Sequence, residues 1–210
     1  TAQPIWITIK IPKNAKAGNY IGQIVIETKE HGTVDIPLNL DIADIELPDP
    51  IDYKFNLDLW LNPSVIAEHY KLEHWSGDHW KMIKTYLEDY ANAGGKNIAT
   101  TITHEPWHKP WIGDSTRSQI EYGYRSMVNW TKKEDGTWAF DYSVFDQYVD
   151  LAQKVGLSGA INAYSLTPFH TKQKIQYTEA ATKQQKVLEV DITDEAYQEI
   201  WIAYLHNFRQ

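Results

Sequence analysis

Three residues near the middle of the chain have the types and the spacing of a zinc site. Residues 97–111 read NIATTITHEPWHKPW, and His104, Glu105 and His108 match the H-E-x-x-H pattern of zinc proteases. In that pattern, two histidines one helical turn apart bind zinc, and the glutamate between them activates a water molecule. The chemistry therefore requires that these residues lie on a helix.

The residues around the pattern do not favour a helix. Residues 98–103 are rich in Ile and Thr, whose β-branched side chains suit a strand. Pro106 stands inside the pattern, where a proline costs a helix about 3 kcal/mol or more. We therefore predict a strand that runs into a non-helical, metal-free aromatic loop. The sequence argues against a zinc protease.

The composition excludes several other classes of protein. The net charge of -8 argues against nucleic-acid binding, which needs basic patches. No cysteine is present, which excludes disulfides, thiolate metal sites and cysteine nucleophiles. No signal peptide and no apolar run long enough to span a bilayer occurs. Seven of the nine tryptophans lie between Trp60 and Trp138, where they either pack in a core or stack on sugar rings.

The first part of the chain has the pattern of β-structure. A period-2 alternation runs through residues 5–11, 24–26 and 34–42, and turn-forming stretches separate the three runs. We predict three antiparallel strands within residues 1–46 that form part of a β-sandwich. The stretch ELPDPID, with its two prolines, marks the boundary to a second domain of residues 47–210.

From residue 50 onward the pattern alternates between strands and helices, which indicates a parallel sheet with right-handed crossovers. Ser76 is the expected cap of the first long helix, and Gly94 and Gly95 end it. Two period-2 runs around a polar turn predict a β-hairpin inserted near residues 173–192. The other predicted elements are strands at 53–61, 98–103 and 158–166, a helix at 140–156, and a last helix capped by Thr193.

Several stretches, taken in order, resemble glycoside hydrolase family 123. No single motif is decisive, and the order and spacing of the stretches carry the resemblance. The matching stretches are PIWITIKIPKNAKAGNYIGQIVI, FNLDLWLNP, FDYSVFDQYVDLAQKVGL, and KIQYT followed by KVLEVDITDEAYQEIWIAYLHNF. The resemblance implies an α/β fold in which a partial β-sandwich is followed by the first part of a (β/α)8 barrel.

The resemblance also implies a reaction. Members of the family cleave terminal β-linked N-acetylgalactosamine by a substrate-assisted, retaining mechanism, in which the 2-acetamido oxygen of the sugar attacks the anomeric carbon. An aspartate orients the acetamido group, and an adjacent glutamate is the general acid and base. This expectation includes a glycan partner, no cofactor, and an exported protein located in the periplasm, at the surface or outside the cell.

The catalytic aspartate–glutamate pair of the family is not recognisable within the chain. The adjacent Asp194 and Glu195 follow Thr193 and begin the last predicted helix, where the helix dipole favours acidic residues. The family pattern places the pair on the next strand, beyond Gln210. We therefore expect an inactive first part of a glycosidase, which docks with the missing barrel half or with another copy. The alternative is a non-catalytic carbohydrate-binding or scaffold protein with the same fold.

The barrel expectation assigns the residues that would contact a sugar. In a (β/α)8 barrel, ligands bind at the carboxyl ends of the strands. Because side chains alternate along a strand, packing beneath a helix is the other interpretation for each of these residues. The expected sugar-binding residues are Asp58, Trp60, His104, Glu105, Trp107, Asn162 and Tyr164.

Two further groups have weaker assignments. Trp111, Trp130 and Trp138 lie in the long connection after the second predicted strand, where they form either the rim of a sugar site or simple packing. His69, His74 and His79 recur every five residues, a spacing that does not place ligands on one helix face. We expect these histidines to be solvated or to lie in loops.

Overall fold

The computed structural model describes residues 4–106, 123–167 and 172–209. The chain divides into two compact units, Thr1–Asp49 and Pro50–Gln210. The element order is mixed α/β, with eight strands and four α-helices among the described residues. The mixed α/β class predicted from the sequence is therefore confirmed. No helix in the described ranges has the length and the apolar character needed to cross a membrane.

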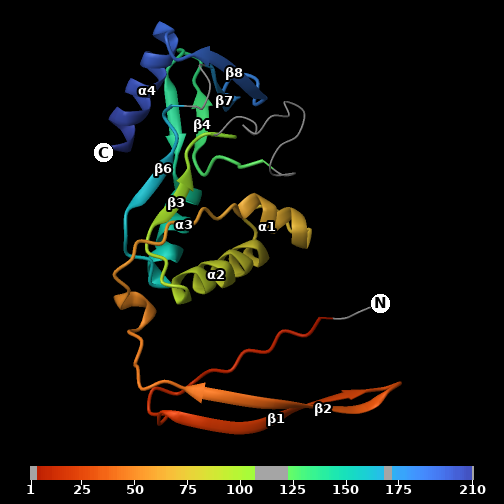
Figure 1. Ribbon diagram of the computed structural model, residues 1–210. Coiled ribbons are helices and arrows are strands. Elements are labelled where there is room, and N and C mark those ends of the chain that lie inside the picture. The colour runs from red at the N-terminus through yellow and green to blue at the C-terminus, as the bar shows by residue number, and fades with distance from the viewer. Residues whose placement is uncertain (1–3, 107–122, 168–171, 210) are drawn as a thin grey trace. The chain divides into compact units, whose positions relative to one another are not determined.

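The smaller unit contains one antiparallel hairpin (Figure 1). Strand β1 (Gly18–Thr28) pairs with β2 (Gly32–Ile42), from Gly18 opposite Ile42 to Thr28 opposite Gly32. The strand predicted at residues 5–11 is wrong, because these residues take part in no sheet. Their alternation marks two faces of an extended chain, but a strand also needs a partner, which the pattern does not specify.

The larger unit contains two separate sheets. In the first, β3 (Ile98–Thr101) pairs in parallel with β6 (Ile161–Tyr164). The second sheet has the order β5-β4-β7-β8, in which β4 and β7 are parallel and the other pairs are antiparallel. Its strands are β4 (Asn129–Lys132), β5 (Trp138–Asp141), β7 (Lys172–Glu179) and β8 (Gln185–Asp191).

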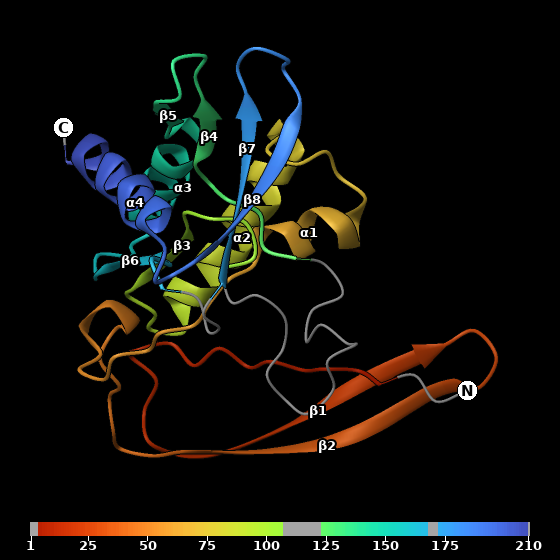
Figure 2. The same cartoon turned by 90° about the horizontal axis from the view of Figure 1, so that it is seen from above.

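The helices of the larger unit cover these sheets (Figures 1 and 2). Helix α3 packs on β3, α2 packs between α1 and α3, and α4 lies beside β5 and β8. A short 3-10 helix, η1, precedes them. Their bounds are η1 (Pro50–Asp52), α1 (Pro63–Tyr70), α2 (Gly77–Asn92), α3 (Ser143–Lys154) and α4 (Glu195–Phe208).

The parallel sheet is smaller than predicted. The strand expected at residues 53–61 is wrong, since only Leu57 forms a bridge, in parallel with Gly95. The Tyr90 hydroxyl donates to the Leu57 carbonyl at 2.7 Å and accepts the Leu59 N–H at 3.3 Å. A tyrosine side chain therefore takes backbone groups that a neighbouring strand would otherwise use, and the described residues form no closed barrel.

The predicted ends of α2 and the predicted start of α4 are correct to within a residue or two, whereas α3 begins three residues later than predicted, because residues 140 and 141 belong to β5. Ser76 caps α2 by accepting the His79 N–H at 3.3 Å, as the sequence predicts. At α4 the cap is Asp194 rather than Thr193. The Thr193 N–H and hydroxyl both donate to the Asp191 carboxylate, at 3.0 and 2.8 Å, so Thr193 belongs to the preceding turn.

His79 is fully buried and lies in α2, which corrects the prediction that it is solvated or in a loop. Its Nδ1 accepts the Trp75 N–H at 2.8 Å, and its Nε2 lies 2.8 Å from the Pro63 carbonyl oxygen. A carbonyl only accepts, so Nε2 carries the proton and Nδ1 does not. Protonating Nδ1 would set two donors against each other. Burial lowers the pKa of His79 below its ordinary value of 6.5.

This neutral histidine predicts a loss of stability in acid. Below pH 6.5 the unfolded chain takes up a proton at His79 that the folded chain, with its lower pKa, does not bind. The free energy of unfolding should therefore fall as the pH drops from about 7.5 to about 5.5 in urea titrations. His79→Gln should flatten part of this slope, because burial also lowers the pKa of His74 and His104. An equal slope in wild type and His79→Gln, with exposed His69→Gln as control, would contradict the prediction.

Candidate functional site

Four of the seven predicted sugar-binding residues form one cluster. The Asn162 amide donates to the Asp58 carboxylate at 3.4 Å. The Trp60 and Tyr164 rings lie 5.1 Å apart with an interplanar angle of 56°. Asn162 and Tyr164 belong to β6, and Asp58 and Trp60 to the extended segment that the Gly95 bridge holds in parallel. The cluster therefore joins one strand to a segment that carries a single bridge.

The cluster presents an aromatic surface beside polar groups. The Trp60 side chain is 50% exposed, so part of its ring is open to a ligand. Partial burial and the neighbouring Asp58 carboxylate raise the pKa of Tyr164, while a hydrogen bond with Trp60 opposes that rise. The tyrosine hydroxyl consequently stays protonated at neutral pH and can donate a hydrogen bond. A carboxylate, an amide, a hydroxyl and an indole ring together suit a polyol with one apolar face.

His104 and Glu105 form a second group, which follows β3. Residues 104–106 lie in turns rather than a helix, as the sequence predicts. Glu105 has a φ of 48°, and its N–H donates to the Tyr124 carbonyl at 2.9 Å. Trp107 and His108 lie outside the described residues. No group of three or more His, Asp or Glu side chains in the described ranges is arranged to hold a metal ion.

The Glu105 carboxyl group is held in a poorly solvated place. Its Oε1 is buried and has no hydrogen-bond partner among the described residues. Burial raises the pKa of Glu105, and a hydrogen bond from the Tyr124 backbone partly offsets the rise. Gly123 makes room for the carboxyl group, since a Cβ at that position would lie only 1.6 Å from Oε1. The arrangement favours a glutamate that keeps its proton at a higher pH than an exposed one does.

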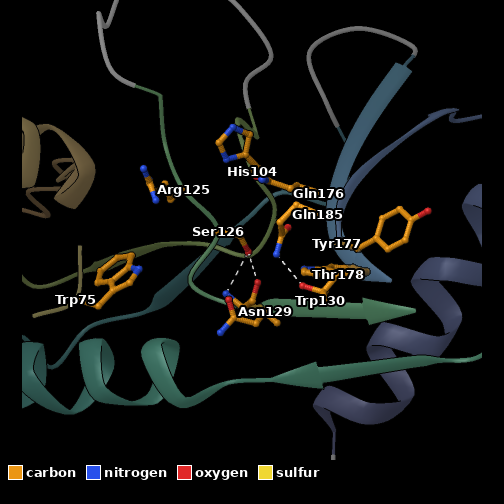
Figure 3. A pocket seen from close by; sticks show the side chains of 11 residues that line it. Trp75, His104, Arg125, Ser126, Asn129, Trp130, Gln176, Tyr177, Thr178 and Gln185 are labelled. Carbon is orange, nitrogen blue, oxygen red and sulfur yellow. Dashed lines mark hydrogen bonds between the residues drawn. The ribbon is translucent and has the colours of Figure 1, made fainter. Parts of the chain in front are cut away.

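Beside His104 lies a cavity of about 510 Å³ (Figure 3). The sequence predicted one of its lining residues as sugar-binding, His104. Trp130 also contributes to the wall, so this tryptophan serves both packing and the cavity. The lining residues are Trp75, His104, Arg125, Ser126, Val128, Asn129, Trp130, Gln176, Tyr177, Thr178 and Gln185.

Sequence reasoning missed most of this cavity because its walls come from two separate insertions. Asn129 belongs to β4, which follows β3, whereas Gln176 and Gln185 belong to the β7–β8 hairpin, which follows β6. Only the pairing of β4 with β7 brings these residues together. Arg125 precedes β4 and carries no motif. Polar residues on short strands give no signal until the pairing of those strands is known.

Comparison with known proteins gives matches to two family models and to several solved structures. Residues 60–210 match the catalytic domain of glycoside hydrolase 123, and residues 1–28 match the glycoside hydrolase 123 N-terminal domain. The chain also resembles the structure of a family 123 glycoside hydrolase from Clostridium perfringens, which was analysed for glycolipid glycan hydrolysis. The two share 29% identity over 95% of this chain, with a TM-score of 0.78.

The matches cover most of this chain but only part of the relative. This chain covers 34% of the Clostridium perfringens chain, and therefore spans about a third of that protein. No curated protein sequence matches the chain. The catalytic-domain model nevertheless covers well over half of the 210 residues, and the resemblance found in the sequence is confirmed. The chain belongs to glycoside hydrolase family 123.

Proposed function

We propose that this chain supplies sugar-binding residues of a glycosidase that removes terminal β-linked N-acetylhexosamine, in particular N-acetylgalactosamine, from glycans. The observation that carries the proposal is the meeting of Asp58 with Asn162 and of Trp60 with Tyr164. Membership of family 123 supports the reaction class. Hydrolysis of glycolipid glycans by the Clostridium perfringens relative supports a glycan substrate.

In this proposal the four residues have two roles, hydrogen bonding to the sugar hydroxyls and contact with the apolar face of the sugar. Asp58 and Asn162 accept from and donate to sugar hydroxyls, because a carboxylate only accepts while an amide does both. Trp60 offers its exposed ring to the apolar face of the sugar, and the Tyr164 hydroxyl donates beside it. Holding the sugar in one orientation is a prerequisite for attack by its own acetamido oxygen on the anomeric carbon.

Asp194 and Glu195 have structural roles in this proposal. Asp194 is the N-cap residue of α4, its carboxylate accepts the N–H of Asp191 in the preceding turn at 2.9 Å, and Glu195 begins the helix. We assign the aspartate that orients the acetamido group and the acid/base glutamate to a part of the protein outside these residues. The proposal also includes a (β/α)8 barrel begun by residues 47–210, a β-sandwich begun by residues 1–46, and export from the cytoplasm.

The sugar-binding role predicts which side chains matter for affinity. Trp60→Ala should weaken the binding of N-acetylgalactosamine about tenfold, since an aromatic anchor contributes more than 1 kcal/mol. Asp58→Asn should weaken it by a similar factor through loss of charge-assisted hydrogen bonds. Chemical-shift titration of the chain with the free sugar measures both effects.

The control for this titration is Trp6→Ala, whose side chain is 93% exposed in the smaller unit and should leave the affinity unchanged. Unchanged affinity in both Trp60→Ala and Asp58→Asn would remove the basis of the proposal. An assay on a chromogenic β-N-acetylgalactosaminide tests the catalytic assignment separately. Turnover by this chain that is lost in Asp194→Asn or Glu195→Gln would place the catalytic pair at the start of α4.

A further inference from the structure

The cavity beside His104 has an unusual charge for this protein. The chain carries 28 acidic and 20 basic residues, yet none of the described residues that line the cavity is acidic. The lining includes the guanidinium group of Arg125 and the imidazole ring of His104. A cation in a wall whose described lining has no carboxylate favours a positive potential inside the cavity of an acidic protein.

The polar groups of the cavity fall into two sets. Internal hydrogen bonds occupy the first set: the Trp130 indole donates to the Ile102 carbonyl at 2.7 Å, and the Gln185 amide donates to the Thr178 hydroxyl at 2.7 Å. These bonds make part of the wall rigid. They also leave those donors unavailable to a ligand.

The second set is available to a ligand. The hydrogen bonds and ion pairs of the described chain do not use the side chains of His104, Arg125 or Gln176. Among the described residues, Arg125 forms hydrogen bonds through its backbone: its N–H donates to the Ser64 hydroxyl at 3.2 Å, and its carbonyl accepts the Thr101 hydroxyl at 2.6 Å. In the view of Figure 3, His104 lies between Arg125 and Gln176. Within the described part of the chain, three side chains with donor groups are therefore left without partners around one cavity.

The electrostatic interaction between His104 and Arg125 agrees with this geometry. Burial lowers the pKa of His104, and the positive charge of Arg125 lowers it further. The two groups therefore lie close enough for the charge of Arg125 to act on His104, and an anion between them would offset the effect of Arg125 on the protonated imidazole. A guanidinium group binds carboxylate and sulfate oxygens in pairs, which adds orientation to the attraction.

The shape of the cavity suits a sugar-sized ligand. Its volume of about 510 Å³ lies within the range of small-molecule sites. Trp75 contributes an aromatic wall on the same side as Arg125 in Figure 3. An isolated inorganic anion would use the cation and leave both this wall and most of the volume without a contact.

We propose that this cavity binds an anionic substituent, a carboxylate or a sulfate, carried by the glycan on which the protein acts. The inference rests on the proposed function, because the anion belongs to the same glycan. Arg125 holds the anionic group, Gln176 donates to it or to a neighbouring hydroxyl, and the Trp75 ring contacts the sugar that carries it. The substrate class is thereby narrowed to acidic glycans.

The test compares charged and neutral sugars on the chain by chemical-shift titration. The probes are N-acetylgalactosamine, its 6-sulfate, N-acetylneuraminic acid and inorganic sulfate. At least one acidic sugar should bind about tenfold more tightly than the neutral sugar, the gain expected of a charge-assisted hydrogen bond. Arg125→Gln should remove this preference and leave the affinity for the neutral sugar unchanged. Whichever acidic sugar is preferred identifies the source of the charge.

Arg209→Gln is the matched control, since it removes the same charge from an exposed residue at the end of α4. The absence of any preference for charge, or a preference that survives in Arg125→Gln, would overturn the inference. Inorganic sulfate that binds as tightly as the acidic sugar would also overturn it, because a general anion site needs no glycan. If the chain binds neutral and acidic sugars equally well, the inference fails but the proposed function stands. If the chain binds inorganic sulfate but none of the sugars, the proposed function fails as well.

Discussion

Replacing Trp130 by alanine is expected to lower the free energy of unfolding by about 3–5 kcal/mol, the range of large aromatic truncations in a core. The Trp130 side chain is only 2% exposed. Its ring stacks on Tyr204 at 5.1 Å with an interplanar angle of 9°. It meets Phe140 and Trp201 edge to face, at 4.9 and 5.6 Å. Alanine at this position would leave a cavity between β4, β5 and α4.

A hydrogen bond adds to the expected loss. The Trp130 indole N–H donates to the Ile102 carbonyl at 2.7 Å, which ties the second sheet to the residues just after β3. Trp130→Phe keeps an aromatic ring but loses the donor and part of the indole volume, so it should cost less than alanine, with about 1–3 kcal/mol of the loss from the unpaired carbonyl. Urea unfolding followed by circular dichroism measures both variants.

Trp6→Ala is the control, because it removes a tryptophan side chain of the same size from an exposed position. The Trp6 side chain is 93% exposed, and its removal should change stability by no more than about 0.5 kcal/mol. If Trp130→Ala unfolds at nearly the same urea concentration as wild type, the aromatic cluster does not hold the second sheet to α4. Equal losses in Trp130→Ala and Trp130→Phe would assign the effect to what both variants lack, which is the N–H donor and the part of the indole beyond a phenyl ring.

The elements that the sequence predicts well are those whose signals are local. The stripe of Trp80, Ile83, Leu87 and Tyr90, with a serine before it and two glycines after it, specifies α2 by itself. The parallel pairing of β3 with β6 follows from strand–helix alternation. Each of these features depends on residues near one another in the chain, or on a general rule of chain connection.

The elements that the sequence does not predict depend on distant partners. Strands β4 and β5 have four residues each, too few for an alternation to stand out, and they appear only as a hairpin that pairs with β7. Residues 53–61 have a strand-like composition, but a side chain from α2 takes their backbone groups. In both cases a tertiary contact overrides the local preference.

The candidate site also has a part that the sequence predicts and a part that it does not. The convergence of Asp58 with Asn162 is predictable, because the ends of parallel segments meet at one edge. The cavity around Arg125 is not, because its residues converge only when two inserted hairpins form one sheet. Trp130 combines the two. The sequence left open whether this ring forms the rim of a sugar site or packs in the core, and in the structure it is buried in the core and also lines the cavity.

Gly95→Ala is expected to lower the free energy of unfolding by about 1–3 kcal/mol, as overpacking does, and also to weaken sugar binding. A Cβ at Gly95 would lie 2.2 to 2.4 Å from the ring of Tyr90. That ring carries the hydroxyl that donates to Leu57 and accepts from Leu59. Displacing Tyr90 would release the segment that positions Asp58, and a displaced carboxylate loses its alignment with Asn162.

Two matched variants separate the effect on stability from the effect on sugar binding. Tyr90→Phe keeps the ring and removes the hydroxyl, so it should weaken sugar binding with a smaller loss of stability, about 1 kcal/mol for its hydrogen bonding. Gly77→Ala places a methyl group in open space at the start of α2, and it should leave stability unchanged or raise it by up to about 1 kcal/mol. Urea unfolding and titration with N-acetylgalactosamine measure the two effects on each variant. Full sugar affinity in a destabilised Gly95→Ala would show that Tyr90 stabilises the fold without positioning Asp58.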